Sequence, residues 1–529
     1  MNNLGSTATM ISSWVFLLLI LSLPNPGLSL SRVDYLARRK AVFNEEFSTR
    51  IGAKLKLNAA EASVNKILMD AKRSEIAQGL TDGKFPPSRH FFLARDDIEK
   101  SAVFKIIKIM PKGAILHAHD SSMLDFHELI KLATYSPDVY MCFTNDGTLQ
   151  FKYMNKLPAK PECSWRNVMK ARDEAASPEA FDNMLYKKMS METPNPQKLY
   201  PTINAVWKRF LNVFLSIGGL VHYKPLMAKY LEAAFKSAVE DNVQYVEARC
   251  LLTPTYNIDG SLNSREESLD ILRSATQEFV KNYPNDFVGF KVIGSAIRAQ
   301  NASLIGDRVK EAIQFRQKYP SFYAGFDLVG QEDPGHSLLY FLDDLLLPSQ
   351  MNPPVDLPYF YHAGETNWNG EDVDDNMVDA VLLNTSRVGH GFAILKHPFV
   401  AKSIREKPIA VELNPVSNQV LKLVDDLRNH PASALFSTDY PVVVSSDDPP
   451  IWGALPLSHD FYMAFMGFAS AEDDLRLLKQ LAINSIKYSA MSDEEKVKAF
   501  RLWQTKWSQF IDKVLAESRF NQQNYVVSN

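Results

Sequence analysis

Eight short apolar segments, separated by stretches long enough to form helices, constrain the fold of this chain most strongly. Helix-length stretches between them include 264–281, 306–318 and 372–383. Strands that are apolar along their whole length are typical of parallel sheets covered on both faces. Eight of them alternating with helices predict an α/β fold, a closed (β/α)8 barrel of the TIM type. The predicted strands are Ala114 to His119, Val243 to Leu252, Phe287 to Ile297, Tyr323 to Val329, Tyr359 to His362, Arg387 to His390, Ile409 to Leu413 and Val442 to Ser446.

The remaining segments do not fit the barrel pattern. Residues 31–105 place apolar side chains at helical spacing and predict a helical arm. About 120 residues separate the first and second strands, where about 30 suffice for a βα unit, so we expect an inserted subdomain. The predicted organisation is a signal peptide at 1–29, the arm at 30–105, the barrel at 106–134 and 201–515, the insertion at 135–200 and a C-terminal tail at 516–529.

The N-terminus indicates export. The apolar run from Ile11 to Leu23 is too short to span a bilayer and is followed by Pro24 and small residues, which is typical of a secretory signal peptide; an uncleaved anchor is the alternative. The sequons at Asn301 and Asn384 are expected glycosylation sites in a secreted, extracellular protein.

Cysteine usage fits that compartment. Only three cysteines are present, too few for a disulfide scaffold. Cys142 and Cys163 are close enough in sequence to pair, which closes a loop of about 20 residues and contributes roughly 3 kcal/mol. Cys250 lies in an apolar strand and is expected to be a buried thiol.

Charge argues against a polyanionic partner such as nucleic acid. Lys plus Arg is 58 and Asp plus Glu is 61, a formal net charge of −3, and no block of like charge occurs. Hydrophobic residues at 46% and charged residues at 22% exclude a disordered chain.

Histidines and carboxylates gather where the predicted strands end, which is where barrel enzymes carry their catalytic groups. His117 and His119, at i and i+2, point to the same face of the first strand; one exposed and one core histidine is the alternative. Imidazole and carboxylate ligands without thiolate suit zinc, and an open position would make the site catalytic. The other strand ends carry His362, Glu365, His390, Asp447 and Asp448.

Several other patterns are absent from the sequence. His127-Glu128 lacks the second histidine of a metalloprotease helix, and no thiolate zinc motif of the nucleobase deaminases occurs. The chain also has no Gly-rich phosphate loop and no Gly-x-Ser-x-Gly elbow.

The ordered set His117-Ala118-His119, His362-Ala363-Gly364-Glu365, Gly389-His390-Gly391 and Ser446-Asp447-Asp448-Pro449 resembles the adenosine deaminases of the metal-dependent amidohydrolase superfamily. The signal peptide, arm, insertion and Val246-Glu247-Ala248-Arg249 resemble the secreted branch, the adenosine deaminase-related growth factors. This resemblance implies that the arm forms a homodimer and that the insertion binds a cell-surface receptor or glycosaminoglycan.

The resemblance also implies residue roles. One zinc ion would be held by His117, His119, His362 and Asp447. Glu365 would protonate the purine ring, and His390 would orient the attacking water and take its proton. Substrate contacts would come from Asp448, Gly330, Asp327 and Trp207, although Asp448 as a solvated turn residue and Trp207 as a core residue are the alternatives.

The sequence therefore predicts a secreted zinc-dependent deaminase that converts adenosine and 2′-deoxyadenosine to inosine products and ammonia. An extracellular receptor-binding growth factor that uses the barrel as a scaffold is the alternative. Deamination of a nucleotide would require a basic phosphate cradle, which the sequence does not reveal.

Overall fold

The computed structural model describes residues 30–159 and 161–527, so the predicted signal peptide lies outside the described residues. Two four-stranded parallel sheets, in the orders β1-β5-β6-β7 and β11-β10-β9-β8, close into one barrel. Parallel bridges at Phe326–Tyr359 and Ala118–Asp447 join the two sheets at both seams. The strands are β1 (Gly113–His119), β5 (Val243–Cys250), β6 (Gly289–Ile297), β7 (Tyr323–Val329), β8 (His362–Ala363), β9 (Arg387–His390), β10 (Ala410–Leu413) and β11 (Val442–Val444).

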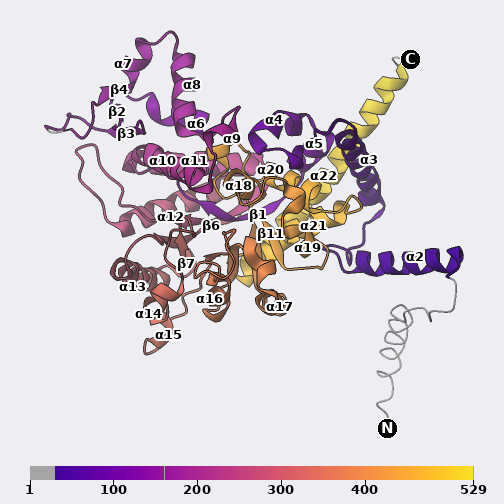
Figure 1. Cartoon of the computed structure of the whole chain (residues 1–529). Helices are drawn as coiled ribbons and strands as arrows, with labels where there is room; N and C mark the ends of the chain where they lie inside the picture. The colour runs from indigo at the N-terminus through magenta and orange to yellow at the C-terminus, as the bar shows by residue number, and fades with distance from the viewer. Residues whose placement is uncertain (1–29, 160, 528–529) are drawn as a thin grey trace.

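These strands confirm the predicted barrel. The fifth strand is shorter than expected, because the segment that begins at Tyr359 makes only an isolated bridge before β8. Helices cover the outside of the barrel (Figure 1). They include α6 (Phe126–Thr134), α10 (Ile203–Val221), α11 (Lys224–Glu240), α12 (Arg265–Asn282), α13 (Ala302–Lys318), α14 (Leu342–Leu345), α15 (Leu347–Gln350), α16 (Asn376–Leu382), α17 (Pro398–Glu406), α18 (Pro415–Val420), α19 (Ala432–Phe436), α20 (Ser458–Met463) and α21 (Leu475–Lys487).

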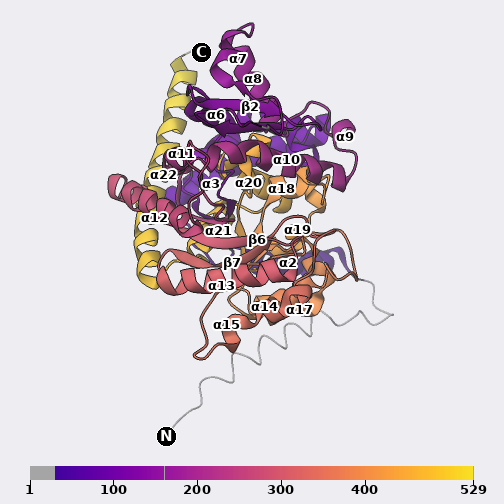
Figure 2. The ribbon, with the colours of Figure 1, turned by 90° about the vertical axis from the view of Figure 1, so that its left-hand side faces the viewer.

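The C-terminal helix α22 (Asp493–Val527) runs along one side of the barrel (Figure 2). A separate tail from residue 516 was expected, but the helix continues through that point. Among the described residues, none of the helices combines the length and apolarity needed to cross a bilayer.

The insertion after β1 forms a small lobe that projects from the barrel (Figure 1). Its antiparallel sheet contains β2 (Val139–Phe143), β3 (Leu149–Tyr153) and β4 (Arg166–Asn167), with helices α7 (Val168–Asp173), α8 (Pro178–Met189) and α9 (Pro196–Leu199). A disulfide joins Cys142 in β2 to Cys163, with Cα atoms 6.0 Å apart. The lobe rests on α10, where Gly219 allows close approach because a Cβ there would lie 1.7 Å from the carbonyl oxygen of Phe151.

Only the first helix of the N-terminal arm is free of the barrel. Helix α2 (Arg32–Ser48) buries no residue and extends away from the body (Figure 1). The helices α3 (Ala59–Asp82), α4 (Phe91–Lys100) and α5 (Ala102–Ile109) bury apolar side chains against their own chain. A hydrogen bond also joins α3 to the C-terminal helix: Glu61 Oε1 accepts from Trp507 Nε1 of α22 at 2.7 Å. Many apolar side chains of α3 to α5 are therefore covered by their own chain, whereas Leu80 and Leu93 are exposed, and packing of the arm on a second copy stays a prediction.

Lys72 is a buried cation at the contact between α3 and the barrel. Its Nζ donates to the carbonyl oxygens of Ser470 at 2.8 Å and Asp473 at 2.9 Å and lies 3.9 Å from the centre of the Phe465 ring. Burial lowers the pKa of Lys72 to about 7, although the charge of Asp473 acts to raise it. The docked arm therefore carries a group that titrates near neutral pH.

We expect Lys72→Met to change the pH dependence of stability. The pKa of Lys72 is 10.5 in its ordinary state and about 7 in the fold. Between these values the unfolded chain binds more protons, so the free energy of unfolding of the wild type rises with pH. Below pH 7 Lys72 is charged in the folded wild type, and burying that charge destabilises the fold. The melting temperature of the variant minus that of the wild type should therefore be higher at pH 6 than at pH 9. Lys66→Met, at an exposed position, is the control; an equal difference at both pH values would contradict the prediction.

Candidate metal centre

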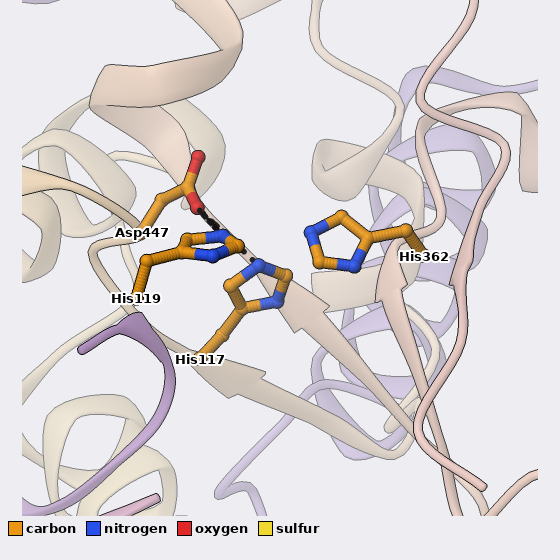
Figure 3. A group of neighbouring side chains, drawn as sticks. All are labelled: His117, His119, His362 and Asp447. Atoms are coloured by element: carbon orange, nitrogen blue, oxygen red, sulfur yellow. Dashed lines mark ion pairs between the residues drawn. The ribbon is translucent and has the colours of Figure 1, made fainter. Parts of the chain in front are cut away.

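Three histidines and one aspartate converge at the C-terminal rim of the barrel (Figure 3). His117 and His119 come from β1, His362 from β8, and Asp447 follows β11. One ligand atom from each lies within 4.8 Å of all the others. His117 Nε2 and Asp447 Oδ1 are buried without a hydrogen-bond partner, which an ion at the centre of the cluster would supply. Three imidazoles and a carboxylate are a ligand set that fits a catalytic zinc ion.

Carboxylates behind two of the histidines fix their orientation. Glu412 Oε2 lies 2.7 Å from His117 Nδ1, and Asp327 Oδ2 lies 2.6 Å from His362 Nδ1. Each Nδ1 is therefore occupied, which leaves Nε2 for a metal, as in most histidine metal sites. Asp327 was expected to contact the substrate. Asp327 is instead fully buried and does not line the cavity. It contacts the metal-ligating residue His362.

A buried ion network underlies these carboxylates. Arg249 lies 3.0 Å from Asp327 and 2.7 Å from Glu412. Arg387 lies 2.5 Å from Glu412 and 2.6 Å from Glu247. Burial alone would raise the pKa of Glu412, but the two arginines hold it well below its usual range. Glu412 is therefore ionised and accepts from His117.

A cavity of about 340 Å³ opens beside the metal ligands. Five of the residues predicted for catalysis or substrate binding line it, and helix α10 supplies an apolar wall. Trp207 lies in that wall and is 5% exposed, and Gly330 occupies a left-handed position with φ of 101°. The lining contains Glu365, His390, Asp448, Gly330 and Trp207 with Asp120, Phe210, Phe214, His222, Ile297 and others.

Three carboxyl groups that line this cavity have raised pKa values; one of them is Asp120, whose pKa burial raises to about 6. Burial raises the pKa of Glu365 well above its usual range, and the charges of Asp447 and Glu332 add to the effect. Burial and the neighbouring charge of Asp447 likewise raise the pKa of Asp448, whose Oδ1 accepts from Ser122. The shifts at Glu365 and Asp448 favour the protonated carboxyl group, which can donate a proton or hydrogen bond to a ligand.

The predicted glycosylation sites lie at the surface. Asn301 and Asn384 are both exposed, and Asn301 also caps the N-terminus of α13. Cys250 is a buried free thiol in β5.

Sequence reasoning missed the residues behind the metal ligands. Glu412 and Arg387 received no role, and Glu247 and Arg249 served only as part of a resemblance. A signal was available, since each is a charged residue inside an otherwise apolar strand, where an unpaired charge is too costly to bury. Their partners could not be assigned, because they come from different strands.

A closed parallel barrel with three histidines and a carboxylate at its C-terminal rim defines a metal-dependent hydrolase of the amidohydrolase type. Comparison with known proteins makes the assignment more specific. The family described as Adenosine deaminase matches residues 184–502, and the family described as Adenosine/AMP deaminase N-terminal matches residues 15–107. The chain belongs to the adenosine deaminase family, in its adenosine deaminase 2 branch, and is an aminohydrolase.

Individual relatives match along nearly their whole length. The chain is 44% identical over 477 residues to adenosine deaminase 2 of Sus scrofa, covering 89% of this chain and 93% of the relative. It is 42% identical over 501 residues to adenosine deaminase 2 of Homo sapiens, covering 94% and 97%. The solved structure of arabidopsis ADAL complexed with GMP has a TM-score of 0.52 at 18% identity, covering 76% of this chain and 98% of that one, which supports the shared fold.

We expect Glu412→Gln to weaken metal binding. Removing this charge leaves Arg249 and Arg387 without their shared partner and loosens His117, so metal affinity should fall about 10- to 100-fold and the free energy of unfolding by about 3–5 kcal/mol. Metal titration and thermal melts measure both effects. Glu406→Gln, which breaks the exposed Lys402–Glu406 pair of α17, should leave metal affinity unchanged; wild-type affinity in Glu412→Gln would contradict the assignment.

Proposed function

We propose that this protein is a zinc-dependent hydrolase that deaminates adenosine and 2′-deoxyadenosine, giving inosine or deoxyinosine and ammonia. The observation that carries the proposal is a buried carboxyl group with a raised pKa, Glu365, in the cavity that opens beside the four metal ligands. When bound, zinc supplies the positive charge that lowers the pKa of water and makes it nucleophilic near neutral pH.

The residues around the cavity fit a purine in one orientation. Glu365 would give its proton to the ring nitrogen next to the reacting carbon, so that negative charge does not accumulate on the ring during attack. Asp448, whose raised pKa favours the protonated form and whose Oδ2 is free of hydrogen-bond partners, would donate to the imidazole edge of the purine. Gly330 would contact the opposite ring nitrogen through its backbone, and Trp207 would cover the nucleoside.

The cavity favours a nucleoside over a nucleotide. Within the described part of the chain, the only lysine or arginine lining it is Arg249, which is already paired with Asp327 and Glu412. A phosphate group would therefore enter this cavity without a free cation to bind it.

We expect Glu365→Gln to separate proton delivery from binding. The amide keeps the size of the side chain but lacks the acidic proton, so kcat should fall by about 10²-fold or more while zinc and substrate still bind. Inosine formation, metal content and substrate binding measure the three quantities. Glu371→Gln, at an exposed position, is the control. Near-normal turnover in Glu365→Gln would show that another group is the acid.

Export and partner binding complete the proposal. The Cys142–Cys163 disulfide supports an oxidising compartment, and the exposed sequons are compatible with glycosylation. The projecting lobe offers a surface for a receptor or glycosaminoglycan. If growth-factor activity is the principal function, it should persist in the inactive Glu365→Gln protein.

A homodimer through the arm also belongs to the proposal. Helix α2 exposes apolar side chains that its own chain does not cover, namely Val33, Tyr35, Leu36, Val42, Phe43 and Phe47. Such a face is stabilised by packing on a second copy.

We expect the double variant Leu36→Asp/Phe43→Asp to be monomeric in sedimentation velocity, because charges on this face cannot be buried in a dimer contact. Arg38→Asp lies on the opposite face of the same helix and is also exposed; it tests whether added negative charge alone has this effect and should remain dimeric. A double variant that stays dimeric would place the interface elsewhere.

A further inference from the structure

A chain of hydrogen bonds runs away from the cavity behind His390. The Nδ1 atom of His390 lies 2.9 Å from Asn418 Nδ2, and Asn418 Oδ1 lies 2.9 Å from His430 Nε2. The Nδ1 atom of His430 accepts from the backbone amide of Ala432 at 3.0 Å. The three side chains are at most 1% exposed, so each depends on these protein partners for its hydrogen bonds.

The backbone amide fixes the direction of the whole chain, because a peptide N–H can only donate. His430 Nδ1 must therefore be unprotonated, and a neutral imidazole then carries its proton on Nε2. That proton is donated to Asn418 Oδ1, which orients the amide so that Nδ2 donates to His390 Nδ1. A neutral His390 is thereby left with its proton on Nε2.

The surroundings of His430, the residue at the far end of this hydrogen-bond chain, keep its imidazole neutral. Burial lowers its pKa to about 3. Its ring lies between Phe392 and Phe468, with ring centres 5.0 Å and 4.5 Å away. A protonated His430 would also direct an N–H at the N–H of Ala432, which would break the first hydrogen bond of the chain.

We propose that Asn418 and His430 are positioning residues that hold His390 as the neutral tautomer with its proton on Nε2, directed at the attacking oxygen. Nε2 lies 4.0 Å from Asp447 Oδ2 on the metal side of the ring, whereas Nδ1 lies 3.7 Å from Glu365 Oε1, beyond hydrogen-bond distance. In this tautomer His390 donates a hydrogen bond.

This role rests on the proposed deaminase function and differs from the one that the family resemblance implies, in which His390 takes a proton from the water. A hydrogen-bond donor stabilises the deprotonated form of its acceptor. His390 therefore favours loss of a proton from the attacking water to solvent before the substrate fills the cavity, and itself remains neutral.

The direct test is the ¹⁵N NMR spectrum of the zinc-loaded full chain labelled at histidine ring nitrogens, with His390→Gln used to assign the His390 signals. We expect Nε2 to show the shift of a protonated nitrogen and Nδ1 that of an unprotonated one at pH 7. A proton on Nδ1 would overturn the proposal. Because this measurement does not use turnover, it is separate from the adenosine assay, whose failure would count against the proposed function.

Asn418→Asp tests the consequence for catalysis. The carboxylate replaces the donor facing His390 with an acceptor, so the proton should move to Nδ1 and kcat should fall by about 10²-fold or more, with little change in KM or zinc content. If His390 instead acts as a base through Nε2, this variant would maintain or increase kcat, which would overturn the proposal.

A second pair of variants tests the role of His430 without placing a charge in the site. His430→Leu removes the donor to Asn418 and should lower kcat and mix the His390 tautomers, whereas His430→Gln supplies an amide N–H and should restore both. His459→Leu is the matched control, since His459 is equally buried and also accepts a backbone N–H, that of Leu455 at 2.9 Å, through Nδ1. Equal losses in His430→Leu and His459→Leu, or no rescue by glutamine, would show a purely structural role and overturn the proposal.

Discussion

The two arginines buried beneath the histidines are the constraint on which the rest of the site depends. Arg249 and Arg387 share Glu412, and through it and Asp327 they orient two of the metal ligands. A buried ion pair is maintained only when its geometry is good and its remaining hydrogen bonds are made. The closed barrel supplies that geometry, because it brings charged groups from β5, β7, β9 and β10 within contact distance of one another. The position of the metal is thus set one layer below the metal ligands.

A similar arrangement holds the groups that face the substrate. Helix α18 follows β10, and two of its side chains point back into the site: Ser417 donates to Asp447 at 2.7 Å and Asn418 contacts His390. On the opposite side, α10 lines the cavity with aromatic residues and supports the inserted lobe. The metal side of the cavity is therefore polar and fixed by hydrogen bonds, while its outer wall is apolar and continuous with the lobe.

Much of the fold could be predicted because the pattern is local. The eight strands were found from runs of apolar residues, and the histidines from their position at strand ends. The long interval after β1 revealed the insertion. The helices of the arm could be predicted in the same way, but not the surface on which each of them packs. Periodic apolar positions show that α2 to α5 are helices, but the periodicity is the same whether a helix packs on its own barrel, as α3 does, or leaves its apolar side chains exposed, as α2 does.

The sequence by itself determined the barrel and the gathering of histidines and carboxylates at its rim, because strand periodicity specifies which side chains reach that edge; the choice of four of them as metal ligands came from the resemblance to the adenosine deaminases. Only the tertiary structure decided which buried side chains hydrogen-bond to the histidines at the rim. Asp327 lies outside the cavity lining and contacts His362, Glu412 connects two arginines with His117, and Asn418 connects His390 with His430. These partners come from segments far apart in the chain, and a buried polar group is satisfied by whichever neighbour the fold places within hydrogen-bond distance, which residue spacing does not encode.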